Sequence, residues 1–260
     1  MDSLLKELKL ARIRMIYKDY IEKANKDEIS YYDFLKNLLL EELAAREENR
    51  LCRKMRKANF PFEKTIESFN FSLRPEFNKR TFLGYLTESF IQDGHCLVFI
   101  GPPGLGKTHL SVAIGIRMIE LGFTARFILA QHLVNEYLKE KQRGKDNTLL
   151  SPLKKVDLLI IDEFGYLPYP EKAGPLFYEL IASRYERNLS TIITSNKALR
   201  EWGNILHDMS LATALVDRLM ERGDVYYLSG ESYRLRGKEK NLWFPLNKKG
   251  ENIKEKINNG

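Results

Sequence analysis

The loop at residues 101–108 reads GPPGLGKT and carries residue types that hold phosphate groups. It fits the pattern G-x-x-x-x-G-K-[ST], between the apolar run CLVFI and a helix-forming stretch. Glycines let successive backbone N–H groups turn toward phosphate oxygens, and the helix adds its positive N-terminal end. Lys107 would reach the β and γ phosphates, and the Thr108 hydroxyl would ligate Mg²⁺. The candidate nucleotide-binding residues are therefore Gly101, Pro102, Pro103, Gly104, Leu105, Gly106, Lys107, Thr108 and the adjacent His109.

A pair of carboxylates, Asp162 and Glu163, follows the apolar run VDLLII, which is typical of a buried strand. At the end of that strand, Asp162 would hold Mg²⁺ through water. Glu163 would act as a general base on the water that attacks the γ-phosphate. The pair predicts hydrolysis of the nucleotide, the alternative being a merely polar strand end.

A third polar group, Asn196, ends the run STIITSN, where it would hydrogen-bond the γ-phosphate or the lytic water. The following NKAL is similar to the guanine-reading pattern N-K-x-D. Leu199 stands, however, where that pattern has its discriminating Asp. ATP is therefore predicted in preference to GTP.

Two arginines are candidates for the cation that neutralises charge on the γ-phosphate. Arg218 lies near the end of an apolar helical stretch, and Arg234 lies beyond the last apolar run. The alternative is that each is a surface arginine without a catalytic role. If a neighbouring subunit supplies Arg218, hydrolysis depends on assembly.

The elements that must position these residues follow from an alternation that begins at residue 95. The apolar runs CLVFI, ARFIL, VDLLII, STIIT and VYYL recur about every 30 residues, with helical stretches between them. This alternation predicts an α/β fold with a five-stranded parallel sheet and helices on both faces. The phosphate loop then joins the first strand to the first helix, where such sheets bind phosphate.

The chain before the sheet predicts a small all-helical domain. Apolar residues recur near helical spacing from residue 2 to about 58, and Ser30 is a suitable N-cap. The stretch ANFPFEKTIESFNF has little periodicity and predicts a linker. We therefore divide the chain into an N-terminal helical domain for DNA or partner binding (1–66), an ATPase domain (67–237) and a basic C-terminal tail (238–260).

Charge is unevenly distributed along the 260 residues, whose formal net charge is +7. Lys and Arg outnumber Asp and Glu by 15 to 12 in residues 1–66 and by 8 to 3 in 234–260, against 19 to 20 between them. The segment Arg46–Lys57 has six basic and two acidic residues, which predicts a basic stripe along one helix. Basic flanks favour a polyanionic partner such as nucleic acid, the other interpretation being a solvated surface.

The cellular compartment is predicted from what the sequence lacks. Its two cysteines, Cys52 and Cys96, match no metal spacing, and no apolar run is long enough to span a bilayer. No signal-like N-terminus is present. We expect a cytoplasmic protein without a membrane partner.

The motifs together resemble a known family. The spacing of GPPGLGKTHL, DLLIIDEFGYL, TSN, VDRLMERG and SYRLRG is similar to the AAA+ ATPases of the IstB and DnaC group, and the resemblance reaches upstream to RKANFPFEKTIESFNF. IDEFGYLP and the short tail resemble IstB more than the replicative helicase loaders. The resemblance implies Walker A roles for Lys107 and Thr108, Walker B roles for Asp162 and Glu163, sensor 1 for Asn196, an arginine finger acting in trans for Arg218 and sensor 2 for Arg234.

The resemblance also implies a function. The expected protein is an ATP- and Mg²⁺-dependent ATPase that forms a homo-oligomer on duplex DNA and assists an IstA-like transposase in target selection. The alternative is a DnaC-like helicase loader, which would grip a helicase through its N-terminal domain and touch single-stranded DNA. A small-molecule P-loop kinase is a third class, but it would have no use for the basic flanks or for the two arginine segments.

Overall fold

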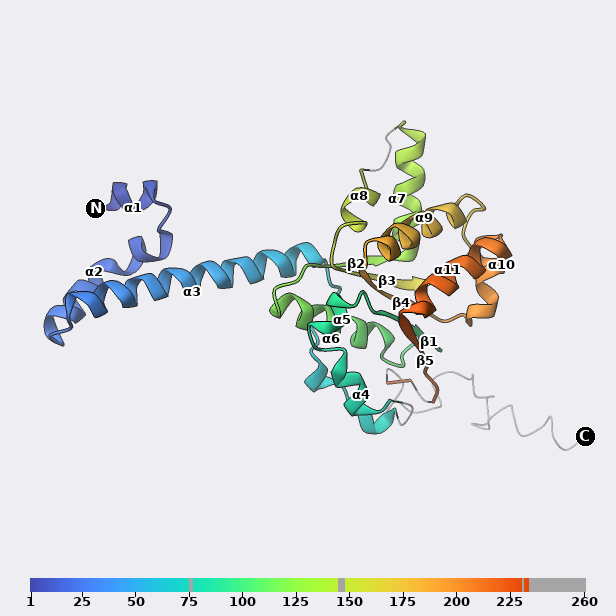
Figure 1. Ribbon diagram of the computed structural model, residues 1–260, viewed down its shortest axis with the longest axis horizontal. Coiled ribbons are helices and arrows are strands. Elements are labelled where there is room, and N and C mark those ends of the chain that lie inside the picture. Colours follow the sequence, from blue (N-terminus) through green and yellow to red (C-terminus); the bar gives the residue numbers. More distant parts are fainter. Residues whose placement is uncertain (75–76, 145–147, 231, 234–260) are drawn as a thin grey trace, which may run out of the picture.

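The computed structural model describes residues 1–74, 77–144, 148–230 and 232–233. These residues form a helical arm at the N-terminus and a layered α/β body (Figure 1). Arg234 and the predicted tail at 238–260 lie outside the described residues. Within the described ranges, no helix is both long enough and apolar enough to cross a membrane.

In the described part of the chain, the sheet has five strands in the order β2-β3-β4-β1-β5. Every neighbouring pair is parallel, which confirms the predicted fold class. Each strand overlaps one of the five apolar runs, and the three inner strands are almost entirely buried, as expected for strands covered on both faces. The strands are β1 (Cys96–Ile100), β2 (Ala125–Leu129), β3 (Leu158–Phe164), β4 (Ser190–Ser195) and β5 (Gly223–Tyr227).

Helices cover both faces of this sheet (Figure 1). Because successive strand residues point to opposite faces, Leu97 and Phe99 join one core, whereas Val98 and Ile100 join the other. The first core lies under α4 (Lys79–Gly84), α5 (Ser89–Gln92) and α6 (Lys107–Glu120). The second lies under α7 (Ala130–Gln142), α8 (Leu150–Leu153), α9 (Ala173–Glu186), α10 (Trp202–Leu206) and α11 (Met209–Glu221).

The N-terminal arm consists of α1 (Asp2–Glu7), α2 (Ala11–Lys26) and α3 (Tyr31–Ala58). The long helix α3 reaches out from the body, α2 lies along its outer half, and α1 contacts α2 (Figure 1). Ser30 caps α3 as predicted, since its Oγ accepts the Asp33 N–H at 3.1 Å. The core of the arm is small, with Leu5, Ile13 and Leu38 buried.

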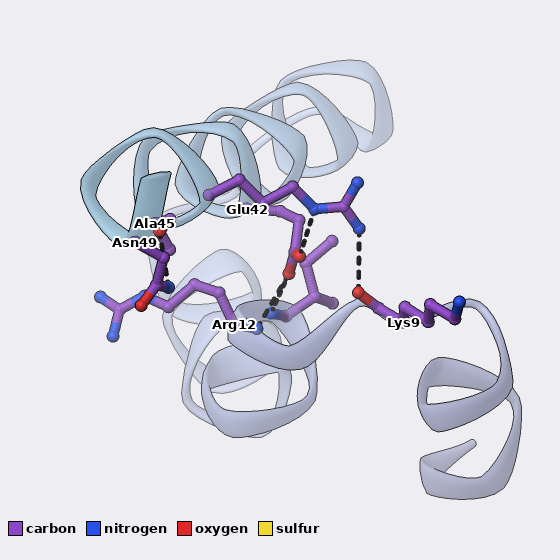
Figure 2. Close-up of polar contacts among 7 residues, drawn as sticks. Lys9, Arg12, Glu42, Ala45 and Asn49 are labelled. Atoms are coloured by element: carbon purple, nitrogen blue, oxygen red, sulfur yellow. Dashed lines mark hydrogen bonds and ion pairs between the residues drawn. The ribbon is translucent and has the colours of Figure 1, made fainter. Parts of the chain in front are cut away.

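A buried carboxylate, Glu42 of α3, joins α2 to α3. Its Oε2 accepts the N–H groups of Arg12 and Ile13, at 2.9 and 3.1 Å, so that it caps the start of α2 (Figure 2). Its Oε1 accepts Arg46 Nε at 2.8 Å, and Arg46 also donates to the Lys9 carbonyl oxygen at 2.9 Å. The pKa of Glu42 is lowered overall, because burial destabilises the carboxylate less than these hydrogen bonds stabilise it. The carboxylate thus stabilises the arm as an anion.

The predicted basic stripe occupies the inner half of α3. Arg50, Arg53, Arg56 and Lys57 are exposed, as expected for a basic face. Lys54 is half-buried, because its ammonium donates to the Gly122 carbonyl oxygen of the body. Lys54 therefore helps to attach α3. The other five basic residues of the segment are exposed, and one of them, Arg46, is paired with Glu42.

The segment after α3 packs against the body rather than running through solvent. It contains the short helices η1 (Ile66–Ser68) and η2 (Phe71–Leu73), and Phe69 between them is buried in the core under α6. The apolar residues of this stretch pack onto different parts of the body, Phe69 against Gly106 of the phosphate loop and Phe60 against Gly115 of α6. The domain boundaries at 66/67 and 237/238 stay predictions.

Candidate nucleotide site

The phosphate loop joins β1 to α6, where it was predicted. Two of its glycines are required by close approach of other chain segments. A Cβ atom on Gly101 would lie 2.4 Å from the Leu228 carbonyl oxygen, and one on Gly106 would lie 2.7 Å from Cε2 of Phe69. Gly106 also has φ = 97°, a backbone conformation that glycine adopts readily. The loop is therefore a tightly enclosed turn.

Positive charge is concentrated on this loop. Lys107 Nζ donates to the carbonyl oxygens of Gly101, at 2.6 Å, and Pro102, at 2.8 Å, so the ammonium lies over the loop. Lys107 is also the first residue of the 14-residue helix α6, whose N-terminal end carries a partial positive charge. A phosphate group is the ligand that complements both features.

An oxygen-rich pair, Thr108 and Asp162, links the loop to the end of β3. Thr108 Oγ1 lies 3.0 and 3.1 Å from the two carboxylate oxygens of Asp162. Asp162 is 3% exposed, and burial raises its pKa although the Thr194 and Thr108 hydroxyls donate to it. A hydroxyl beside a desolvated carboxylate is a donor set that Mg²⁺ prefers, so these residues fit the predicted metal.

Glu163 occupies an irregular position beside this pair. It has φ = 59°, and the register of β3 against β4 shifts between Ile161 and Phe164. Its N–H donates to Thr194 Oγ1 at 3.1 Å, and its side chain is exposed. This backbone conformation costs about 1–2 kcal/mol in a non-glycine residue. Strain of this kind is typical of functional positions and turns one carboxylate outward while Asp162 stays buried.

Asn196 directly follows β4 and lies between the two motifs. The last residue of β4, Ser195, pairs with Ile100 before the phosphate loop and with Phe164 after Glu163. The Oδ1 atom of Asn196 is buried and accepts no hydrogen bond from the described residues. An unpaired buried acceptor is unfavourable, so this position suits a ligand or water that donates a hydrogen bond.

His109 contacts the segment before the sheet. Its Nε2 lies 3.0 Å from the Thr65 carbonyl oxygen and 3.1 Å from Ser68 Oγ, and its ring meets Phe69 edge-on. Burial lowers the pKa of His109, which favours the neutral imidazole. The described contacts of His109 connect the phosphate loop to the linker, and its predicted nucleotide contact stays a prediction.

Arg218, near the end of α11, lies at the other end of the sheet. It lines a small cavity with Gly94, Cys96 and Thr191, residues that precede or begin β1 and β4. The phosphate loop leaves β1 at its opposite end, about 16 Å away at roughly 3.3 Å per strand residue. Among the described residues, one chain therefore does not bring Arg218 together with Lys107, Glu163 and Asn196.

The Arg218 guanidinium is held by its own chain. Nη2 donates to the Tyr178 hydroxyl at 3.1 Å, Nη1 donates to the Ala214 carbonyl oxygen at 2.9 Å, and the guanidinium carbon lies 4.9 Å from the centre of the Tyr178 ring. One turn later, Arg222 stacks on Tyr185 at 4.5 Å. These contacts order the Arg218 guanidinium within its own chain.

No local sequence pattern predicts the roles of two further residues, Thr194 and Tyr178. Thr194 donates to Asp162 Oδ1 and accepts the Glu163 N–H, so it holds both carboxylate residues. It is hidden inside an apolar run, and its role depends on the pairing of β3 with β4. Tyr178 lies in an ordinary helix, and only the packing of α9 on α11 reveals its contact with Arg218.

Sequence comparison identifies the family. The profile described as IstB-like ATP binding protein matches residues 3–241. The chain is 40% identical over 217 residues to the insertion sequence IS5376 putative ATP-binding protein of Geobacillus stearothermophilus, covering 84% of this chain and 86% of that one. It is 33% identical over 240 residues to the insertion sequence IS21 putative ATP-binding protein of Pseudomonas aeruginosa, covering 92% and 90%.

Structural comparison identifies the fold. The DnaC helicase loader superposes with a TM-score of 0.52 at 23% identity, over 68% of this chain and 99% of that one. AMPPCP-bound DnaA from Aquifex aeolicus superposes with a TM-score of 0.54 at 19% identity, over 66% and 52%. At these identities the likeness shows the fold alone, which is that of AAA+ P-loop NTPases. The chain therefore belongs to the IstB-like ATP-binding protein family, and it is an ATP-binding protein of the AAA+ ATPase class.

Proposed function

We propose that this protein is a Mg²⁺-dependent ATPase whose active site is completed between neighbouring copies on duplex DNA, where it assists a transposase in target selection. The observation that carries this proposal is the separation of Arg218 from the phosphate loop. One chain holds the groups that bind ATP and activate water. A second copy would supply the missing cation.

Nucleotide binding is assigned to the loop and the start of α6. The loop amides would surround the phosphates, and Lys107 would exchange its two carbonyl partners for phosphate oxygens. Thr108 and Asp162 would hold Mg²⁺, which when bound neutralises charge on the phosphates. His109 would contribute from the adjacent helix turn.

Hydrolysis is assigned to the strand ends beside the loop. Glu163 would accept a proton from the water that attacks the γ-phosphorus, as the bond between this phosphorus and the β–γ bridging oxygen breaks. Asn196 Oδ1 would accept the other proton of that water in a hydrogen bond, which would satisfy its unpaired acceptor. The products are ADP and inorganic phosphate.

Two arginines would respond to the γ-phosphate. Arg218 would act in trans, because it lies about one strand length from its own phosphate loop. Arg234, next in sequence to Tyr233, would act as sensor 2. Homo-oligomerisation is thus a requirement for turnover.

The assignment of DNA and a transposase as partners rests on the charge of the chain and on its sequence similarity to insertion-sequence proteins. The exposed arginines of α3 offer phosphate contacts, and the basic segment 234–260 adds to them in sequence. Two relatives are named as ATP-binding proteins of insertion sequences. A helper of a transposase, encoded with it in such a sequence, fits both observations.

The proposal is tested by titrating duplex and single-stranded DNA at three salt concentrations, with ATP, with ADP and without nucleotide. We expect ATP to promote duplex binding with little sequence preference, and a steep loss of affinity with salt. Chelation of Mg²⁺ should abolish hydrolysis. Strong preference for single strands would contradict the proposal and favour the helicase-loader alternative.

A further inference from the structure

Two carbonyl groups of the phosphate loop are held from outside by donors that lie far apart in the sequence. Arg74 Nε donates to the Leu105 carbonyl oxygen at 3.1 Å, and the Tyr233 backbone N–H donates to the Gly104 carbonyl oxygen at 2.9 Å. Arg74 precedes the sheet, whereas Tyr233 follows its last strand. Arg74 is 3% exposed and Leu105 is 1% exposed, so bulk water is a poor substitute for these donors.

Arg74 and Tyr233 also hold one another, and together we call them the outer clasp. The guanidinium carbon of Arg74 lies 4.6 Å from the centre of the Tyr233 ring. Arg74 Nη1 donates to the carbonyl oxygens of Leu73, at 2.9 Å, and Ser229, at 3.3 Å. The Tyr233 hydroxyl donates to the Asn70 carbonyl oxygen at 2.8 Å. The linker and the segment after β5 thereby meet on the outside of the loop.

The clasp determines where the loop amides point. In a trans peptide the C=O and the following N–H point in opposite directions, and the described chain has no cis peptide. Holding the Gly104 carbonyl outward therefore turns the Leu105 N–H away from the clasp. Holding the Leu105 carbonyl outward does the same for the Gly106 N–H. These are amides that a phosphate loop presents to its ligand.

We propose that Arg74 and the Tyr233 N–H are positioning groups for ATP, which act on the nucleotide through the peptide planes of the loop. The inference rests on the proposed nucleotide site. Arg74 and the Tyr233 N–H each keep one amide directed at the phosphates before ATP arrives, so binding does not have to reorganise the loop. The same contacts link the nucleotide site to the linker that leads from α3.

The fold provides a matched control in its other buried arginine, Arg184. It is 1% exposed and also donates to backbone carbonyls, those of Leu153 at 2.6 Å and Val156 at 2.8 Å. It also donates to Ser190 at the start of β4, the end of that strand opposite Asn196. Loss of either arginine removes similar hydrogen bonds, but only Arg74 touches the phosphate loop.

The test compares Arg74→Lys with Arg184→Lys, by calorimetric titration with ATP and ADP and by thermal unfolding. Lysine keeps the positive charge but cannot reproduce the fork of guanidinium hydrogen bonds. Both variants should unfold at lower temperature. Arg74→Lys should bind ATP and ADP about tenfold more weakly or worse, the loss expected for one charged hydrogen bond. Arg184→Lys should retain wild-type affinity.

A second pair of variants tests the backbone donor without changing a buried charge. Tyr233→Pro removes the N–H that bonds Gly104, whereas Tyr233→Ala removes only the ring and hydroxyl. We expect Tyr233→Pro to bind ATP more weakly than Tyr233→Ala. This pair decides the question if Arg74→Lys does not fold.

Each outcome has one meaning. If the wild-type protein does not bind ATP, the proposed site fails and the clasp fails with it. If the wild type binds ATP, equal affinities for wild type and Arg74→Lys, or equal losses for Arg74→Lys and Arg184→Lys, overturn the clasp alone. Equal ATP affinities for Tyr233→Pro and Tyr233→Ala also overturn the clasp.

Discussion

The two ends of the parallel sheet differ in how completely their polar groups are satisfied. At the carboxyl end, Asp162 is buried with a raised pKa, Asn196 has an unpaired acceptor and Glu163 has a strained backbone. At the amino end, Arg218 is already bonded to Tyr178 and Ala214. One end is prepared for a ligand that the chain does not supply. The other holds a guanidinium that is ordered by its own chain and lies away from the phosphate loop.

This difference suggests why hydrolysis would follow assembly. Among the described residues, a chain by itself has the loop and the carboxylate proposed to activate water, but its Arg218 lies at the opposite end of the sheet. Stacking on Tyr178 limits the motion of the Arg218 guanidinium, so less conformational entropy is lost when it meets a neighbour. The comparison therefore predicts that damage at either end stops turnover, but only damage at the carboxyl end impairs nucleotide binding.

The largest expected effect is that of Arg218→Ala. It should lower steady-state hydrolysis by about a thousandfold or more, the range of arginine fingers, with ATP affinity unchanged. The matched control is Arg222→Ala, which removes the neighbouring tyrosine-stacked arginine and should have a much smaller effect. If Arg218→Ala hydrolyses ATP at the wild-type rate, the amino end of the sheet takes no part in catalysis.

Glu163→Gln should reduce hydrolysis by about 10² to 10⁴, the range of general-base catalysis, because the amide cannot accept the proton from water. ATP binding should persist, and the DNA-bound oligomer should accumulate. Hydrolysis and ATP affinity are measured on the same sample. The control is Glu171→Gln, an exposed carboxylate to which no role is assigned. Turnover near the wild-type rate in Glu163→Gln would remove this residue from the mechanism.

A more moderate effect is expected from the arm. Changing Arg50, Arg53 and Arg56 together to Ala should weaken duplex binding, and the slope of log affinity against log salt should fall by about one unit for each DNA phosphate that is no longer neutralised. Lys54 is left intact because it attaches α3 to the body. Hydrolysis without DNA should not change.

Its control is the triple change of Arg14, Lys18 and Lys23 to Ala, which removes equal charge from the exposed surface of α2. Equal reductions of affinity in the two triple variants would indicate a general charge effect. An unchanged salt slope in the α3 variant would place the DNA surface on the sheet domain.

The smallest effect is on stability and compares one aspartate from each end. Asp162→Asn should raise the melting temperature without Mg²⁺ by about 2–4 °C, because it relieves the desolvation that raises the pKa of Asp162. Asp224→Asn should not stabilise, since Asp224 is half-exposed and accepts Tyr85 and His95 at 2.6 and 2.9 Å. A melting temperature that falls in Asp162→Asn would show that its carboxylate is not a stability cost.

The fold was predictable because its inner strands are buried on both faces and therefore read as continuous apolar runs, whereas the edge strand β5 is only partly buried. The order of the strands in the sheet was not predictable, since it depends on which strands each connecting helix crosses. The packing of the linker was also missed. Phe69 and Arg74 have no periodic spacing, because Phe69 lies against Gly106 and Arg74 donates to Leu105, in a loop more than 30 residues later.

The residues of the nucleotide site were predictable where they belong to one contiguous motif. They were less predictable where their positions depend on how neighbouring strands pair. The loop, Thr108 and Asp162 meet as expected, because the first and third strands end at the same edge of the sheet. Thr194 and the bulge at Glu163 depend on the register of β3 against β4, which no local pattern encodes. The basic stripe was predicted as a whole, but only the structure distinguishes Lys54 from its exposed neighbours.

The central claim, that one active site is shared by two chains, is tested most directly by mixing two inactive variants. Lys107→Ala should fail to bind ATP but retain Arg218, whereas Arg218→Ala should bind ATP but lack the cation. Mixed oligomers contain interfaces that pair an intact Lys107 site with an intact Arg218. The account predicts that hydrolysis in the mixture exceeds that of either variant alone at the same total concentration. If no mixing ratio exceeds the two separate rates, Arg218 does not act in trans.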